Sequence, residues 1–198
     1  MMISEKIYDE LHMWTKKYIK EKCIITNNVM PGKIPGTIYT WIFYLRRGLF
    51  NHEFLSAVSQ MFFYKIEKEI GHFNFQIAGL ETASTPMLAA FPIIGRMFEK
   101  NLNSFSIRKE RKEYGLRNWV EGIPNNLPVL LIDDLCNSSN SLYLAKNILE
   151  NEKLPILNKA FVLVNKTNHI DNNTDKYIDS DMEMISLFNL SDFGLYYD

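Results

Sequence analysis

The sequence has few cysteines, no long apolar run and almost no net charge, and each of these absences excludes a class of protein. Two cysteines, Cys23 and Cys136, without a CxxC pair build neither a disulfide framework nor a cysteine zinc site. A formal net charge of −1 gives no general attraction to nucleic acid or to an anionic membrane. No apolar run approaches the roughly 18 residues that span a bilayer. The first residues, 1–22, mix both charge signs, unlike a signal peptide. We therefore expect a cytoplasmic protein that binds neither nucleic acid nor membrane.

The length and the order of elements predict one α/β domain. The chain has 198 residues, of which 46% are hydrophobic and 23% charged, as in globular proteins. Apolar spacing predicts a helix from Ile3 to Tyr18, and two prolines and two glycines predict a loop over 27–36. Helices and strands then alternate. The predicted strands are 37–44, 73–79, 104–108, 129–132, 159–165 and 182–188, and the predicted helices begin at 51, 85 and 142. This order favours a central, mostly parallel sheet flanked by helices.

The stretch from Val129 to Leu142 is the strongest candidate for a functional site. Four apolar residues lead into Asp133 and Asp134, a run of five small polar residues (137–141) follows, and an amphipathic helix comes next. In open α/β sheets, ligands bind beyond the carboxyl ends of the strands, and a helix N-terminus suits a phosphate. Two carboxylates beside it suit sugar hydroxyls or a divalent cation. The stretch therefore predicts a sugar-phosphate site.

Three other segments bear on this site. The loop 79–84 is a second strand-to-helix junction at the same edge of the sheet. The basic run 108–118 has five cations among eleven residues, and it is either a solvated face or a mobile loop over a phosphate. Lys33 is the single charge of the loop 27–36, and a lone loop lysine is usually solvated.

Taken together, these segments resemble the type I phosphoribosyltransferases, and the orotate phosphoribosyltransferases most closely. Residues 129–142 are similar to the family's loop for phosphoribosyl pyrophosphate (PRPP), and Arg108 to Gly115 is similar to its mobile Arg-Lys-Glu loop. Weaker similarities are Gly32-Lys33-Ile34-Pro35 and the ending over 185–192. The four occur in the family's order. The resemblance implies a type I phosphoribosyltransferase-like fold, as a single domain over 1–198, with an N-terminal helix and hood over 1–45 and a core over 46–198.

The resemblance also implies a reaction and a set of roles. The family transfers ribose 5-phosphate from PRPP to a base nitrogen with Mg²⁺, releases pyrophosphate, and is a homodimer whose loop, here 109–118, reaches the partner's site. Asp133, Asp134 and Lys112 would be catalytic. Mg²⁺ would be held mainly by substrate oxygens and water. The residues that would bind PRPP and its phosphates are Asn137, Ser138, Ser139, Asn140, Ser141, Arg108 and Lys109. The residues that would lie near the base or the pyrophosphate are Lys33, Ala83, Ser84 and Lys166.

The sequence departs from the family pattern in the parts that face the base and the pyrophosphate. The loop 137–141 has no glycine, where the family usually has one that permits a positive φ. Ala83 and Ser84 stand where orotate enzymes have lysine and glycine, and Tyr114 replaces a histidine. Asn165-Lys166 replaces an Asp-Arg pair, so the planar fork for a carboxylate is lost.

Three functional hypotheses follow. The first is an active phosphoribosyltransferase acting on orotate or a related base. The second is a regulatory domain of the same fold that binds PRPP or a nucleotide without turning it over. In the third, the aspartates are only polar groups at a strand end, Asn140 or Ser141 is only a helix N-cap, and the segment binds nothing.

Overall fold

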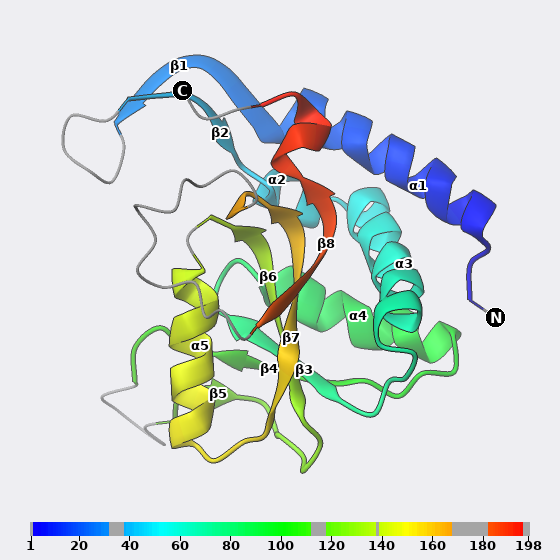
Figure 1. The fold of residues 1–198 in the computed structure, drawn as a ribbon, viewed down its shortest axis with the longest axis vertical. Coiled ribbons are helices and arrows are strands. Elements are labelled where there is room, and N and C mark those ends of the chain that lie inside the picture. The colour runs from blue at the N-terminus through cyan, green and yellow to red at the C-terminus, as the bar shows by residue number, and fades with distance from the viewer. Residues whose placement is uncertain (1, 32–37, 112–117, 138, 168–181, 196–198) are drawn as a thin grey trace.

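The computed structural model describes residues 2–31, 38–111, 118–137, 139–167 and 182–195, which form an α/β fold around one large sheet (Figure 1). The helices are α1 (Glu5–Tyr18), the π-helical turn η1 (Ile19–Cys23), α2 (Arg46–Leu49), α3 (His52–Glu69), α4 (Thr85–Met97), α5 (Asn140–Asn151) and the 3-10 turn η3 (Leu190–Phe193). The strands are β1 (Ile24–Pro31), β2 (Ile38–Phe43), β3 (Gln76–Leu80), β4 (Asn103–Ile107), β5 (Val120–Glu121), β6 (Val129–Cys136), β7 (Ile156–Asn165) and β8 (Glu183–Asn189).

The six-stranded sheet confirms the predicted fold class. Its strand order is β5-β4-β3-β6-β7-β8, and every neighbouring pair is parallel except the short β5 against β4. Helices α1, α3 and α4 lie on one side of the sheet and α5 on the other (Figure 1). The central strands β6 and β7 carry the apolar runs 129–132 and 160–164, because both faces of the sheet are covered there.

Local signals in the sequence fix the helix ends. Asn51 caps α3, because its side-chain oxygen accepts a hydrogen bond from the Phe54 N–H at 3.0 Å. Gly71 follows the helix with φ +77, the left-handed conformation that ends many helices. The start of α3 agrees with the helix predicted to begin at 51. Pro92 does not end α4, which continues to Met97.

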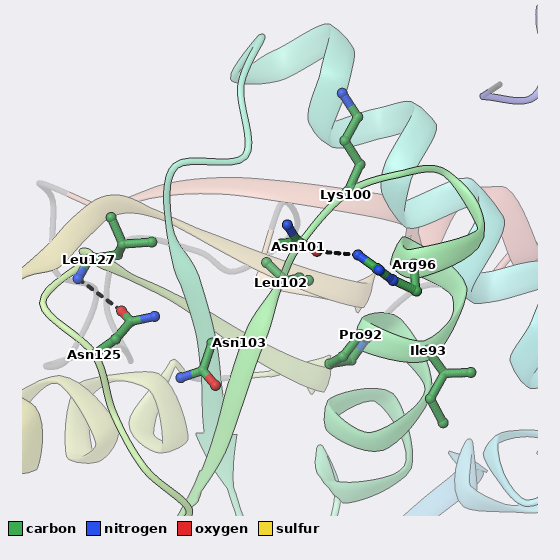
Figure 2. A pocket seen from close by; sticks show the side chains of 9 residues that line it. All are labelled: Pro92, Ile93, Arg96, Lys100, Asn101, Leu102, Asn103, Asn125 and Leu127. Carbon is green, nitrogen blue, oxygen red and sulfur yellow. Dashed lines mark hydrogen bonds between the residues drawn. The ribbon is translucent and has the colours of Figure 1, made fainter.

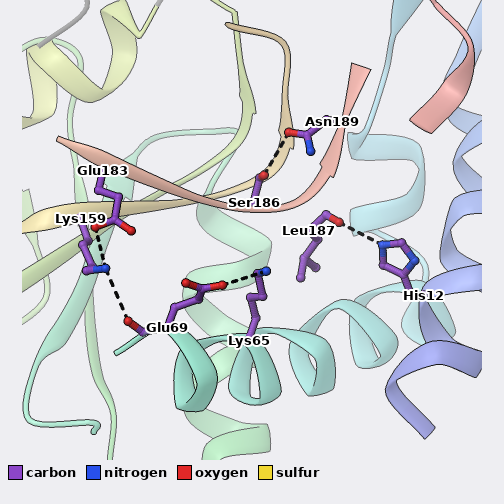
Figure 3. A network of polar contacts seen from close by, with 8 residues as sticks. All are labelled: His12, Lys65, Glu69, Lys159, Glu183, Ser186, Leu187 and Asn189. Carbon is purple, nitrogen blue, oxygen red and sulfur yellow. Dashed lines mark hydrogen bonds and ion pairs between the residues drawn. The ribbon is translucent and has the colours of Figure 1, made fainter. Parts of the chain in front are cut away.

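Helix α1 forms as predicted, but its buried stripe is shifted by one residue. Ile7 and Trp14, which belong to the apolar spacing that predicted this helix, are exposed. The inward positions are Tyr8, Leu11, His12, Thr15 and Ile19. Two aromatic contacts set this rotation: the Tyr8 ring stacks on Tyr64 and the His12 ring on Phe188. Figure 3 shows His12 beside β8, where its Nε2 lies 3.0 Å from the carbonyl oxygen of Leu187.

The predicted loop over 27–36 is wrong in its first part, since residues 27–31 belong to strand β1. This strand pairs antiparallel with β2, and the pairing shifts between Thr26 and Met30. The irregularity takes up the two asparagines, which are poor strand formers, so propensity alone hid the strand. The rest of that loop lies outside the described residues, and the two-residue strand β5 was also not predicted. The hood region 1–45 contributes Ile19, Cys23 and Phe43 to the same core as α3 and β8.

Candidate functional site

The polar residues expected at the site meet at the carboxyl-terminal edge of the sheet. Strands β3, β6 and β7 are parallel, so the segments that follow them lie at one edge. The β1–β2 hairpin lies at this same end of the molecule (Figure 1). The carboxyl ends of β3, β6 and β7 therefore lie together at the end of the molecule that carries the hairpin.

Asp133 and Asp134 lie next to each other at this edge, with Asp133 buried at 6% exposure. The N–H of Asp134 donates a 2.9 Å hydrogen bond to Oδ1 of Asp133, which fixes the first carboxylate. Burial, together with the negative charge of Asp134, raises the pKa of Asp133 to about 8. Burial also raises the pKa of Asp134 above its ordinary value. Two adjacent carboxylates out of water resist ionising together, so the pair favours a ligand that brings hydroxyl donors or positive charge.

Two cations partly offset this cost. Burial dominates both pKa values, but the Lys109 ammonium lowers the pKa of Asp133 and the Arg46 guanidinium lowers that of Asp134. Lys109 belongs to the predicted set. Arg46 was missed, because it begins α2, 88 positions before Asp134 in the chain, and nothing in Leu45-Arg46-Arg47 indicates where it lies.

Arg108 is held by two carboxylates of the protein. Its Nη1 lies 3.1 Å from Oε1 of Glu121 and 3.9 Å from Oε2 of Glu81. Its main-chain N–H donates to the Trp119 carbonyl at 2.9 Å. These contacts tie both ends of the segment 108–119 to the sheet. Arg108 therefore begins the basic run and is paired with Glu81 and Glu121. Among the described residues of the run, Lys109 and Arg111 are exposed cations.

The loop after β6 makes one sharp turn into α5. Ser139 precedes the helix with φ +54 and ψ 2, so a serine adopts the left-handed conformation for which a glycine was expected. Helix α5 begins at Asn140, and Ser139 is the N-cap, so the alternative that Asn140 or Ser141 is the cap is wrong. Asn137, Asn140 and Ser141 are exposed around this turn. The N-terminus of α5 therefore faces the edge that carries the aspartates.

The loop between β3 and α4 packs against β6 beside the aspartates. A Cβ at Gly79 would lie 2.3 Å from the carbonyl oxygen of Ile132, the residue before Asp133, so only glycine fits there. Ser84 is buried, and its hydroxyl donates to the Leu80 carbonyl at 2.7 Å. Ala83 is half-buried. The loop thus sits where the sequence placed it, but the Ser84 hydroxyl serves the loop itself.

Lys166 lies at the end of β7, under the hairpin. Its main-chain N–H donates to the Cys136 carbonyl at 2.9 Å, and its Nζ lies 4.8 Å from the centre of the Trp41 ring on β2. Burial lowers the pKa of Lys166 to about 8. Asn165 is buried, and its Oδ1 accepts hydrogen bonds from the N–H and the hydroxyl of Thr167. Trp41 is a second residue that the sequence did not single out.

Comparison with known proteins gives both sequence relatives and structural matches. No family model matches the chain. It is 29% identical over 145 residues to an orotate phosphoribosyltransferase of Methanocaldococcus jannaschii, covering 72% of this chain and 74% of that protein. It is 26% identical over 152 residues to one of Methanococcus maripaludis, covering 76% and 77%. A crystal structure of Mycobacterium tuberculosis orotate phosphoribosyltransferase superposes with a TM-score of 0.70 at 14% identity, covering 93% of this chain and 99% of that one.

The chain has the type I phosphoribosyltransferase fold. The resemblance drawn from the sequence motifs is confirmed at this level, and the curated relatives agree with it. Against the family pattern, Ser139 takes the place of a loop glycine, and Ala83 and Ser84 take the place of a lysine and a glycine. Three predicted residues of the phosphoribosyltransferase-like site, Lys33, Lys112 and Ser138, lie outside the described residues.

A separate hollow lies at the opposite, amino-terminal edge of the sheet. It has a volume of about 750 Å³ and is lined by Pro92, Ile93, Arg96, Lys100, Asn101, Leu102, Asn103, Asn125 and Leu127. Figure 2 shows Arg96 bonded to Asn101 on one side and the Asn125–Leu127 turn on the other. None of the aspartates or phosphate-loop residues lines it.

Across the described ranges, no helix is both long and apolar enough to cross a membrane.

Proposed function

We propose that this chain transfers ribose 5-phosphate from PRPP to a ring nitrogen of a base, with orotate the first candidate, and releases pyrophosphate. The observation that carries the proposal is the Asp133–Asp134 pair, buried and half-buried respectively, beside the N-terminus of α5. Its support from other proteins is the similarity to two curated orotate phosphoribosyltransferases.

The aspartates suit the sugar in this reaction. The bond between ribose C1 and the pyrophosphate oxygen breaks, its electron pair leaves with pyrophosphate, and a bond forms from C1 to the base nitrogen. Positive charge develops on the sugar ring as the bond breaks. Asp133 and Asp134 would accept hydrogen bonds from the ribose hydroxyls and stabilise that positive charge. Because Asp133 is fixed by the Asp134 N–H, its carboxylate needs little reorganisation when the sugar binds.

The N-terminus of α5 suits the 5-phosphate. Main-chain N–H groups of its first turn and the positive end of the helix dipole attract a phosphate. Asn137, Ser139, Asn140 and Ser141 surround this turn, and Ser138 belongs to the same proposed cradle. Holding the phosphate here and the hydroxyls at Asp133 and Asp134 would fix the ribose between them.

The basic run and Mg²⁺ would serve the pyrophosphate. Lys109 lies close enough to Asp133 to lower its pKa, so it is placed to meet an anion bound there. Lys112 is proposed to act with it. Within the described ranges no cluster of three acidic, histidine or cysteine side chains is placed to hold a metal ion. The proposed ion would be held mainly by substrate oxygens and water. Mg²⁺ bound near Asp133 and Asp134 would neutralise charge on the leaving pyrophosphate.

Lys166 is the residue proposed to select an anionic base. Its ammonium lies at the end of β7 under Trp41, so an aromatic base in this space would find a ring and a cation together. Lys33, Ala83 and Ser84 are assigned to the same neighbourhood by resemblance to the family. A cation without a planar fork accepts a carboxylate in more than one orientation. The base preference is thus expected to be broader than that of an enzyme with arginine here.

A homodimer is part of this proposal. Ile93 and Met97 of α4 are 67% and 70% exposed. Ile123, which follows β5, is 85% exposed. Exposed large apolar side chains of this kind favour an interface. In the proposed dimer the segment 109–118 would reach the partner's site, as the resemblance to the family implies. Ile93→Glu is expected to give monomers in light scattering after size exclusion, whereas the same change at exposed Leu144 on α5 would not.

The cytoplasm is the proposed location, since Cys23 and Cys136 are both free and buried, as in a reducing compartment.

The test is pyrophosphate release from PRPP and Mg²⁺ with a panel of bases that includes orotate. Turnover with at least one base is expected, with orotate among the best. Pyrophosphate release that requires no base would instead indicate hydrolysis of PRPP. Absence of turnover with every base would reject the enzymatic proposal.

A second function, binding of PRPP or a nucleotide without turnover, is favoured by one observation. The Ser84 hydroxyl is buried and bonded to Leu80, so the loop lacks both the family's lysine and a free hydroxyl to offer pyrophosphate. Calorimetric binding of PRPP without turnover of any base would support this function, and turnover would exclude it.

A further inference from the structure

The phosphate loop contains a serine in a conformation that favours glycine. Ser139 has φ +54, where a Cβ crowds the neighbouring carbonyl and glycine is the usual residue. The turn is nevertheless needed, because it directs the chain from the end of β6 into α5. The contacts of the Ser139 side chain therefore bear on how this turn is held.

The Ser139 side chain makes an unusual contact for a helix N-cap. A capping serine normally accepts a hydrogen bond from a main-chain N–H two or three residues later. Among the described residues Ser139 accepts none from the first turn of α5. Its Oγ lies instead 3.3 Å from the Sγ of Cys136, where either atom can donate. The first-turn N–H groups are thus not occupied by the cap side chain.

Cys136 is a rigid partner for this contact. It is the last residue of β6, 2% exposed, and packs in the same cluster as Leu142 and Ala145 of α5. Its carbonyl accepts the Lys166 N–H at 2.9 Å, which ties it to the end of β7. Both its main chain and its side chain are therefore fixed by the sheet and the core.

We propose that Cys136 and Ser139 form a thiol–hydroxyl clamp that holds the phosphate loop in its glycine-like turn and leaves the first-turn N–H groups of α5 open to the 5-phosphate of PRPP. Both are positioning residues in this role. The proposal rests on the proposed function for its ligand. The clamp itself is a property of the free protein, so it can also be tested without substrate.

The test compares Cys136→Ala, Cys136→Ser and the double variant Cys136→Ala/Ser139→Gly in the full-length protein. Losing one hydrogen bond that orders the loop is expected to raise KM for PRPP roughly three- to tenfold in Cys136→Ala, with kcat little changed. Cys136→Ser keeps a hydroxyl partner and recovers most of that loss. In the double variant, hydrogen exchange at Tyr143 is expected to return toward the wild-type rate, because glycine adopts the turn without a clamp. Cys23→Ala, the other buried cysteine, is the control and leaves KM for PRPP unchanged.

A second measurement does not depend on activity. The Tyr143 N–H donates to the Ser139 carbonyl at 2.9 Å, so its hydrogen exchange reports on the position of Ser139. Exchange at Tyr143 is expected to be faster in Cys136→Ala and restored in Cys136→Ser. Unchanged KM and unchanged exchange in Cys136→Ala would overturn the clamp, as would Tyr143 exchange in the double variant that is as fast as in Cys136→Ala. If the wild-type protein neither binds nor consumes PRPP, the proposed function fails, and the Tyr143 exchange rates still decide whether the clamp exists.

Discussion

The two edges of the sheet use polar residues in opposite ways. At the amino-terminal edge, the buried side chain of Gln76 donates to the carbonyls of Asn125 and Leu127 and accepts from Asn103 and the Asn125 N–H. At the carboxyl-terminal edge, burial and the charge of Asp134 raise the pKa of Asp133 to about 8, so it is costly to ionise both carboxyl groups. The first arrangement is complete without a ligand, whereas the second is relieved by one. Polar groups that satisfy one another stabilise the fold, and polar groups left in conflict mark the place where a ligand binds.

The sharpest way to break this comparison is Asp134→Asn. The change keeps the shape of the side chain and removes the charge that would stabilise the reacting sugar. A loss of about 10²–10³ in kcat/KM for PRPP is expected, as for one preorganised electrostatic contact. Pyrophosphate release measures it, and Asp9→Asn on exposed α1 is the control. Full activity of Asp134→Asn would remove the carboxyl-terminal edge from the mechanism.

Gln76→Leu tests the other edge. Its four hydrogen bonds hold the turn at 125–127 against β3, and their loss leaves buried carbonyl and amide groups unpaired. The free energy of unfolding in urea is expected to fall by about 2–4 kcal/mol, with kcat per folded molecule unchanged. Gln60→Leu on α3, a half-buried glutamine with two long bonds to Ser56, should cost less than about 1 kcal/mol. Equal losses in the two variants would show that the network has no special role.

Asp133→Asn sharpens the contrast through pH. Burial first, and the charge of Asp134 second, raise the pKa of Asp133 to about 8 in the folded state. Between pH of about 4 and 8 the unfolded chain has lost this proton while the folded chain keeps it, so the wild-type free energy of unfolding falls as pH rises. Asparagine removes this term. The variant should be more stable than wild type at pH 8, and this difference should close as the pH falls toward 4. The free energy of unfolding is measured in urea for both proteins. A difference between variant and wild type that is the same at every pH would contradict the raised pKa.

Lys166→Gln tests the base side of the same edge and has the smallest expected effect. Loss of one charged contact should raise KM for orotate about tenfold and leave KM for PRPP unchanged. Because burial lowers the pKa of Lys166 to about 8, wild-type KM for orotate should rise above that pH, whereas that of the variant should not. Lys20→Gln on η1 is the exposed control. Equal changes in both KM values would move Lys166 out of the base site.

Much of the fold could be predicted because its signals are local. The apolar runs that became β6 and β7 belong to strands covered on both faces, and Asn51 and Gly71 act within a few residues of their positions. What failed depended on distant contacts. The rotation of α1 is set by Tyr64 and Phe188, and β1 exists because β2 pairs with it across an irregular register.

The candidate site divides in the same way. Asp133 and Asp134 were predicted because they end a strand beside a helix start. Arg46 and Trp41 were not, because the tertiary fold brings them to the edge from the N-terminal quarter of the chain. In the phosphate loop, the resemblance to the family implied a glycine, which permits a positive φ. Ser139 takes that conformation instead, next to Cys136, and no residue-type preference would have chosen it.

The β1–β2 hairpin forms a two-stranded sheet of its own, separate from the six-stranded sheet. Its ladder of hydrogen bonds can therefore change without disturbing the pairing of β3, β6 and β7. Trp41 shows that the hairpin reaches the part of the site assigned to the base. Under the proposed function, substitutions in this hairpin would change the preferred base. They would leave the residues proposed to bind the sugar and the phosphate unchanged. A chimera that exchanges residues 24–43 with those of a relative would transplant acceptor choice as a module.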